Sequence, residues 1–155
     1  MLDYNSFKEK MQQSNTACKL GIDNSIPSDL RWNLRTLFAH FTSLEQISEK
    51  PIHITSGYRC SLLNKAVGGV SNSNHTKCRA FDFAFNGVSS KADFLQVFDD
   101  LKKTFLTYYQ KTFDDDYRVA LRRFNHHFIV YPDRLFVHYQ IKDGFMMDYL
   151  IPQVK

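Results

Sequence analysis

Residues 79–85, with the sequence RAFDFAF, alternate between large aromatic side chains and small or charged ones. Because successive side chains of a β-strand point to opposite faces, this spacing predicts a strand with Phe81, Phe83 and Phe85 on one face. The other face then carries Asp82 between two alanines, with free space around the carboxylate. We therefore expect a strand with an apolar face that other elements cover and a carboxylate on the opposite face.

Helical periodicity dominates much of the remaining sequence. Residues 5–20 are predicted to form a helix that ends at Gly21, a residue suited to a left-handed terminator. A second helix is predicted to begin near Ser28 and to end at Pro51. Its apolar stripe consists of Leu34, Leu37, Phe38, Phe41 and Leu44. Ser90 and Asp93 have the spacing of a capping box and predict a third long helix.

The segment between the second and third helices combines strand and turn signals. Residues 52–55 alternate β-branched and polar side chains, which predicts a strand leading into Ser56 and Gly57. Ser61 is suited to cap a short helix over residues 62–67, which the pair Gly68-Gly69 would end. A polar loop then leads to His75.

The last third of the chain is rich in β-branched and aromatic residues. We expect three successive strands, in the segments YRVALRRF, HHFIVY and RLFVHYQI, separated by turns at Asn125 and at Pro132-Asp133. Together with the helices, these strands predict the α+β class: a small antiparallel sheet flanked by helices, in a single domain over residues 1–155.

Composition is that of a globular chain. The 155 residues are 43% hydrophobic, and the formal net charge is only +4, so the charge alone argues against a nucleic-acid partner. No run reaches the ~18 apolar residues of a membrane span, and the N-terminus lacks the apolar region of a signal peptide. We therefore expect synthesis in the cytoplasm. The three cysteines lack CxxC spacing and are expected to be reduced thiols.

Two histidines and one aspartate have the composition of a catalytic zinc site. In RLFVHYQI the odd-numbered apolar positions share one face, so His138 points the other way and needs a partner. His75, Asp82 and His138 would supply three ligands and leave the fourth tetrahedral position of zinc open. Spacing alone leaves the alternative open that these histidines are ordinary structural residues.

The run ITSGYRCSLLNKAVGGVSNSNHTKCRAFDFAF resembles the signature of the zinc D-alanyl-D-alanine carboxypeptidase family, which includes phage endolysins. The matching positions are Ser56, Gly57, Tyr58, Arg59, Leu63, Asn64, Val67, Gly68, Gly69, Ser73, His75, Ala80 and Asp82. Residues 21–34 are similar to the N-terminal half of the carboxypeptidase branch, and Phe136-Val137-His138 resembles its closing strand.

The resemblance implies a fold shared with the hedgehog signalling domain, one zinc ion bound by His75, Asp82 and His138, and cleavage of peptidoglycan stem peptides. Arg59 matches the substrate-binding arginine, whose planar fork suits a peptide carboxylate. A structural salt bridge is the alternative for Arg59. Ser73 matches a position that lines the site, and a role in the loop turn is its alternative.

Two positions depart from the family pattern. Cys78 stands where the family has Gly, and it is either a soft zinc ligand or a buried thiol, of which we favour the thiol. The general base is harder to assign, because the three residues before His138 are apolar. Asp133 is the nearest candidate, although it could be a plain turn residue. His126 or His127 could assist as an acid or by stabilising the oxyanion, and Gln140 has no assigned role.

The leading hypothesis is a zinc metallopeptidase of the phage cell-wall hydrolase type that acts on peptidoglycan after lysis or injection, either as a D,D-carboxypeptidase or as an endopeptidase. A rival is a non-catalytic zinc-stabilised binding domain on the same fold. A weaker rival is a nucleic-acid-associated protein, based on Arg118, Arg122 and Arg123.

Overall fold

The alternating segment forms β2 (Ala80–Phe85), an inner strand of a four-stranded antiparallel sheet with the order β1-β2-β4-β3. The computed structural model describes residues 1–114 and 116–142. The other strands are β1 (Ile52–Ser56), β3 (Phe128–Tyr131) and β4 (Phe136–Gln140). Because β2 pairs with β4, Asp82 lies directly opposite His138.

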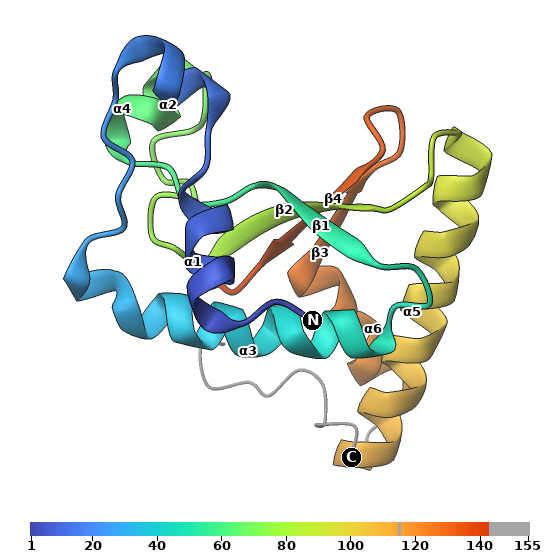
Figure 1. Ribbon diagram of the computed structural model, residues 1–155. Coiled ribbons are helices and arrows are strands. Elements are labelled where there is room, and N and C mark those ends of the chain that lie inside the picture. The colour runs from blue at the N-terminus through green and yellow to red at the C-terminus, as the bar shows by residue number, and fades with distance from the viewer. Residues whose placement is uncertain (115, 143–155) are drawn as a thin grey trace.

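Helices cover the aromatic face of the sheet, and the predicted α+β class is confirmed. The covering helices are α1 (Tyr4–Gln12), α3 (Arg31–Ile47), α5 (Lys91–Phe113) and α6 (Tyr117–His127), with a 3-10 turn (Ser28–Leu30) before α3. The short helices α2 (Asn15–Leu20) and α4 (Ser61–Ala66) lie together beyond one end of the sheet (Figure 1). In Figure 1, α3 runs along the sheet, with α1 towards one end and α5 and α6 towards the other. Phe81 and Phe83 are fully buried and Phe85 nearly so, as the alternation predicts.

The predicted ends of the helices hold in most places. The stripe on α3 is buried except for Phe38, which is partly buried against the core. Ser90 caps α5 by accepting a hydrogen bond from the backbone N–H of Asp93 at 3.2 Å, and Gly21 ends α2 with φ 66°. The first predicted helix is instead divided in two, because Ser14 caps α2 by accepting from the N–H of Ala17 at 3.1 Å.

The predicted strand over residues 117–124 is wrong, because this segment is the first part of α6. Its aromatic and β-branched composition suggests a strand, but its buried residues Ala120, Phe124 and His127 recur at helical spacing. Asp116 caps the helix by accepting from the N–H of Val119 at 3.0 Å. Asn125 therefore lies inside a helix, whereas the predicted turn at Pro132-Asp133 does join β3 to β4.

Two glycines of the family-like run are required by close packing. A side chain at Gly57 would collide with the backbone of Met11, whose carbonyl accepts a hydrogen bond from the N–H of Tyr58 at 2.7 Å. A side chain at Gly69 would collide with the amide of Asn64, which donates to the carbonyl of Val70 at 2.8 Å. These contacts fix the loops that approach β2 from either side of α4. The cap of α4 is Cys60, one residue before the predicted Ser61.

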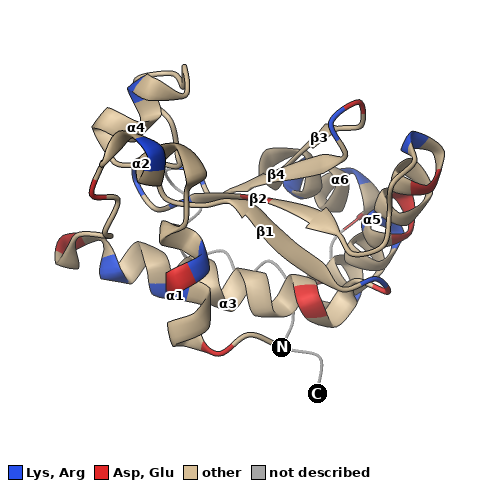
Figure 2. Cartoon of the chain, turned by 45° about the horizontal axis from the view of Figure 1, so that its top comes forward, with Lys and Arg blue, Asp and Glu red and all other residues tan. Residues whose placement is uncertain are grey.

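Charged residues are spread over the helices and loops. Figure 2 shows Lys and Arg positions on several helices, interspersed with Asp and Glu, and both signs at the tip of the β3–β4 hairpin. Among the residues that the structure describes, no helix is long and apolar enough to cross a membrane. The last part of the predicted domain, residues 143–155, lies outside the described residues.

Candidate metal centre

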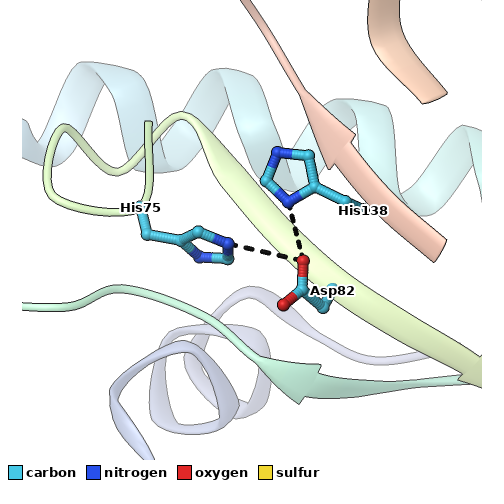
Figure 3. A group of neighbouring side chains, drawn as sticks. All are labelled: His75, Asp82 and His138. Carbon is cyan, nitrogen blue, oxygen red and sulfur yellow. Dashed lines mark hydrogen bonds and ion pairs between the residues drawn. The ribbon is translucent and has the colours of Figure 1, made fainter. Parts of the chain in front are cut away.

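Three side chains from separate segments converge on the face of the sheet opposite to the aromatic one (Figure 3). His75 comes from the loop between α4 and β2, Asp82 from β2 and His138 from β4. One ligand atom from each lies within 4.8 Å of the others. Asp82 Oδ1 is 2.7 Å from His138 Nδ1 and 3.4 Å from His75 Nε2. The pairing of β2 with β4 thus brings together Asp82 and His138, which lie 56 positions apart in the sequence, and the loop before β2 adds His75.

The second ring nitrogen of each histidine has its own partner, and this partner decides which nitrogen faces the group. His75 Nδ1 lies 2.7 Å from the carbonyl oxygen of Gly57, which can only accept, so Nδ1 donates and Nε2 presents its lone pair. His138 has an acceptor beside each ring nitrogen: Asp82 Oδ1 lies 2.7 Å from Nδ1, and Gln140 Oε1 lies 3.2 Å from Nε2. A cation at the centre would take the place of the proton between Nδ1 and Asp82, while Nε2 donates to Gln140.

Asp82 is ionised and has two differently engaged oxygens. Burial acts to raise the pKa of Asp82, but hydrogen bonds and charge interactions with His138 and His75 outweigh it and lower the pKa to about 2. Oδ1 faces the two imidazoles, whereas Oδ2 lies 3.7 Å from an Nη of Arg59. The carboxylate therefore joins the histidines to the arginine.

A cation fits between these three groups. When His75 Nδ1 and His138 Nε2 carry the ring protons, two nitrogen lone pairs and a carboxylate oxygen point at one another, an arrangement that a bound cation stabilises. Zinc bonds of about 2.0–2.1 Å in tetrahedral geometry place neighbouring ligand atoms about 3.3–3.4 Å apart. The 3.4 Å separation of His75 Nε2 and Asp82 Oδ1 matches this value. The 2.7 Å between Asp82 Oδ1 and His138 Nδ1 is a direct hydrogen bond, and these two atoms would move apart to hold zinc. The donor set of two imidazoles and one carboxylate is also that of an open zinc site.

A cavity of about 470 Å³ opens beside the converging side chains. Residues 67–70 and Ser73 line it from the loop after α4, and Tyr131, Arg134 and Phe136 line it from the β3–β4 hairpin. Arg59 and the three converging side chains also line it, so the cavity brings the predicted substrate-binding residues to the candidate metal centre. A larger hollow of about 750 Å³ borders α1 and α2, but the candidate metal-binding group does not line it.

A protein-family model described as Peptidase M15 matches residues 5–113. This range covers more than half of the chain and includes Arg59, Ser73, His75 and Asp82. The chain belongs to the M15 peptidases. This is the zinc D-Ala-D-Ala carboxypeptidase family, so the resemblance found in the sequence is confirmed at the level of the family. His138 lies beyond the matched range, and its place beside Asp82 comes from the pairing of β4 with β2. No curated protein and no solved structure gave a match to the chain.

The two residues predicted to act in proton transfer, Asp133 and His127, do not line the cavity beside the candidate metal centre. Asp133 is exposed in the hairpin turn, where its carboxylate accepts from Lys91 Nζ at 2.7 Å. His127 is fully buried on the aromatic face, where its ring stacks on Tyr139 and its Nδ1 lies 2.7 Å from the carbonyl oxygen of Gln140. Burial lowers the pKa of His127 to about 4, so this imidazole is neutral at pH 7.

Cys78 is a buried thiol, as we favoured. It is fully buried in the core cluster, and burial raises its pKa to about 12. It is not part of the candidate metal-binding group. Its φ is 53°, a left-handed conformation that glycine adopts without strain. The backbone of this loop therefore explains why glycine suits the position in other M15 peptidases.

Gln140 is the supporting residue that sequence reasoning missed. It lies two positions after His138 on β4, so both side chains are on the same face of the sheet. Its Oε1 accepts from His138 Nε2 and from Asn74 Nδ2, the latter at 3.0 Å. Its Nε2 lies 3.4 Å from the carbonyl oxygen of His126, which fixes the orientation of the amide. The i, i+2 spacing from a candidate ligand was the available signal.

Proposed function

We propose that this M15 peptidase is a zinc metallopeptidase that cleaves peptidoglycan stem peptides, either as a D,D-carboxypeptidase or as an endopeptidase, in the manner of a phage cell-wall hydrolase. The observation that carries the proposal is the convergence of acceptor atoms from His75, Asp82 and His138 beside a cavity that also contains Arg59. His75 Nε2, an Asp82 oxygen and His138 Nδ1 would hold the zinc. When bound, zinc supplies the Lewis acidity that polarises a scissile carbonyl and makes a nucleophile available at neutral pH.

Arg59 is the proposed partner of a substrate carboxylate. Its Nη2 donates to Ser56 Oγ at 3.1 Å and lies 3.7 Å from Asp82 Oδ2. Both contacts use the same nitrogen, which leaves Nη1 and Nε without a partner among the described residues. These groups would bind a carboxylate through charge-assisted hydrogen bonds. The salt bridge and the substrate contact are therefore compatible roles for Arg59.

Ser73 is the second proposed substrate-binding residue. Its hydroxyl oxygen accepts a hydrogen bond from the backbone N–H of His75 at 3.2 Å, and the residue lines the cavity. The hydroxyl can still donate its own proton to a substrate carbonyl. Ser73 would thus orient both the loop that carries His75 and a bound peptide.

A non-catalytic zinc-dependent binding domain is the second candidate, and one observation favours it. Among the described residues that line the cavity, Asp82 is the only carboxylate. Peptide hydrolysis needs a group that takes a proton from the nucleophile and passes it to the leaving amine. If Asp82 binds zinc, the described lining offers no second carboxylate for this transfer.

Metal content tests the site shared by both candidates. Elemental analysis of the purified chain is expected to give about one zinc per chain, with loss of the metal in His75→Ala and Asp82→Ala. His53→Ala is the matched control, because His53 lies on β1 and bonds the side chain of Asn86 away from the candidate centre. Retention of zinc in both site variants would show that the ion binds elsewhere.

Digestion of purified peptidoglycan separates the two candidates. Mass spectrometry of the muropeptides is expected to show loss of a terminal D-Ala or a cut cross-link with the zinc-loaded chain. Zinc-loaded protein that cuts no bond would leave the binding domain as the function. Asp133→Ala completes the test, since cleavage at the wild-type rate would exclude Asp133 as the general base.

A further inference from the structure

The β3–β4 hairpin contributes an arginine and two aromatic rings to the cavity beside the candidate metal centre. The rings of Tyr131 and Phe136 stack with their centroids 4.7 Å apart and an interplanar angle of 16°. The guanidinium carbon of Arg134 lies 5.2 Å from the centroid of Phe136. The backbone N–H of Arg134 donates to the carbonyl of Tyr131 at 3.1 Å, which closes the turn. The hairpin therefore holds the guanidinium on an aromatic support at the side of the cavity.

The charge of Arg134 is not neutralised by a described neighbour. No carboxylate of residues 1–114 or 116–142 lies within ion-pair distance of it. Asp133, the adjacent residue, is paired instead with Lys91. The described lining of the cavity therefore contains two arginines, Arg59 and Arg134, and a single carboxylate, Asp82, which the two histidines and Arg59 already engage.

From this arrangement we infer that Arg134 binds a second carboxylate of the substrate, so that the cavity selects peptides with two acidic groups. The inference rests on the proposed function and deepens it: Arg59 binds one carboxylate of the peptide, and Arg134 binds another from the hairpin side. The ligand is an acidic peptide whose two carboxylates are separated by the width of the cavity.

The aromatic support makes Arg134 suited to this role. A guanidinium that lies over a ring still directs its N–H groups outward in its own plane, where they match the two oxygens of a carboxylate. Stacking also restricts the long side chain before the ligand arrives, which reduces the entropy lost on binding. Lysine would supply the charge without the planar fork, so Arg134→Lys separates charge from geometry.

The test compares two synthetic pentapeptides that end in D-Ala-D-Ala. One carries an additional side-chain carboxylate, and in the other this group is a primary amide. Affinity for the zinc-loaded chain is measured by calorimetry as Kd, or as KM where the peptide is cut. The wild type is expected to bind the dicarboxylate more tightly. Arg134→Ala is expected to lower the affinity for the dicarboxylate peptide about tenfold, because one charge-assisted contact is lost, and the affinity for the amide peptide by less than about twofold.

Arg35→Ala is the matched control, since Arg35 also lies over an aromatic ring, that of Tyr4, at 4.8 Å and does not line the cavity. It is expected to leave both affinities unchanged. Arg134→Lys is expected to recover only part of the preference for the dicarboxylate.

An equal loss for both peptides in Arg134→Ala, or no loss for either, would overturn the inference. A wild type that binds neither peptide would overturn the inference together with the proposed substrate class. Cleavage is followed in the same samples, so the two proposals can fail separately. If the chain prefers the dicarboxylate peptide through Arg134 but cuts neither peptide, the inference is supported and the peptidase function is rejected. If the chain cuts both peptides without preferring either, the peptidase function is supported and the inference is rejected.

Discussion

Two pairs of histidines lie on opposite faces of the same sheet and differ in what they contact. On the aromatic face, His40 Nδ1 lies 2.6 Å from the hydroxyl of Tyr139, and His127 Nδ1 lies 2.7 Å from the carbonyl oxygen of Gln140. The His40 and His127 ring centroids are 6.4 Å apart. These contacts hold both imidazoles in the buried core, where each ring packs against Tyr139.

On the other face, His75 and His138 have ring centroids 5.0 Å apart, and both direct a nitrogen at the same oxygen of Asp82. An ionised carboxylate that two imidazoles share is suited to hold a metal ion, whereas the contacts of His40 with Tyr139 and of His127 with Gln140 hold those rings in the core. Burial does not separate the two pairs, because His75 is buried like His40 and His127. What separates them is the shared contact of His75 and His138 with the carboxylate of Asp82.

The same substitution on each face tests this distinction most strongly. His138→Phe is expected to lower zinc affinity by more than about 100-fold, because loss of a ligand exceeds the 10- to 100-fold cost of disturbing its supporting contacts. His127→Phe is expected to retain one zinc per chain, because its ring lies against Tyr139 on the other face. Zinc competition with a chelating dye measures both. Equal affinities in the two variants would remove the functional difference between the pairs.

The metal-site side of this comparison was predictable from the sequence, because it depends on strand alternation. Asp82 lies between alanines in an alternating run, and His138 lies between apolar residues in another, so each could be assigned to the face away from the core. The pairing of the two strands then brings them together. The resemblance to the M15 peptidases supplied the ligand set of His75, Asp82 and His138, which alternation alone does not specify.

The core side was not predictable in the same way. His127 was assigned to a strand by the composition of its neighbours, whereas it lies in the last turn of α6, which directs it into the core. Asp133, on the exposed hairpin, pairs with Lys91, 42 residues away, and does not line the cavity. Contacts between distant parts of the chain decide both positions, and local sequence patterns do not contain that information.

Acid should affect the two faces in separate pH ranges. The pKa of His127 is lowered from 6.5 to about 4, so the unfolded chain binds its proton first, and stability falls as pH drops through this range. The pKa of Asp82 is lowered from 3.8 to about 2. Its contribution to the free energy of unfolding is therefore complete above pH 3.8 and is lost as the pH falls from 3.8 to about 2. The His127 shift corresponds to roughly 3 kcal/mol of unfolding free energy.

Urea unfolding of the zinc-free chain between pH 7 and pH 4 measures the effect of His127. Over this interval the free energy of unfolding of the wild type is expected to fall by roughly 3 kcal/mol more than that of His127→Phe, because the variant has no imidazole at position 127 to protonate. His53→Phe is the control, since its imidazole is exposed and its loss should leave the pH dependence unchanged. If the free energy of unfolding changes equally with pH in the wild type and in His127→Phe, the buried imidazole contributes no acid sensitivity.

Gln140 connects the two faces, because its carbonyl oxygen contacts His127 on one side and its side chain contacts His138 on the other. Gln140→Leu removes the acceptor that holds His138 Nε2–H, and zinc affinity is expected to fall about 10- to 100-fold. Gln140→Glu retains an acceptor for His138 but places its second oxygen against the His126 carbonyl, so zinc affinity is expected to fall less than in Gln140→Leu. The backbone contact to His127 persists in both variants, so the acid sensitivity between pH 7 and pH 4 should not change. If Gln140→Leu loses zinc affinity but keeps its acid sensitivity, the side chain and the backbone of Gln140 support His138 and His127 independently. If zinc affinity and acid sensitivity both change, the two histidine positions are coupled through this residue.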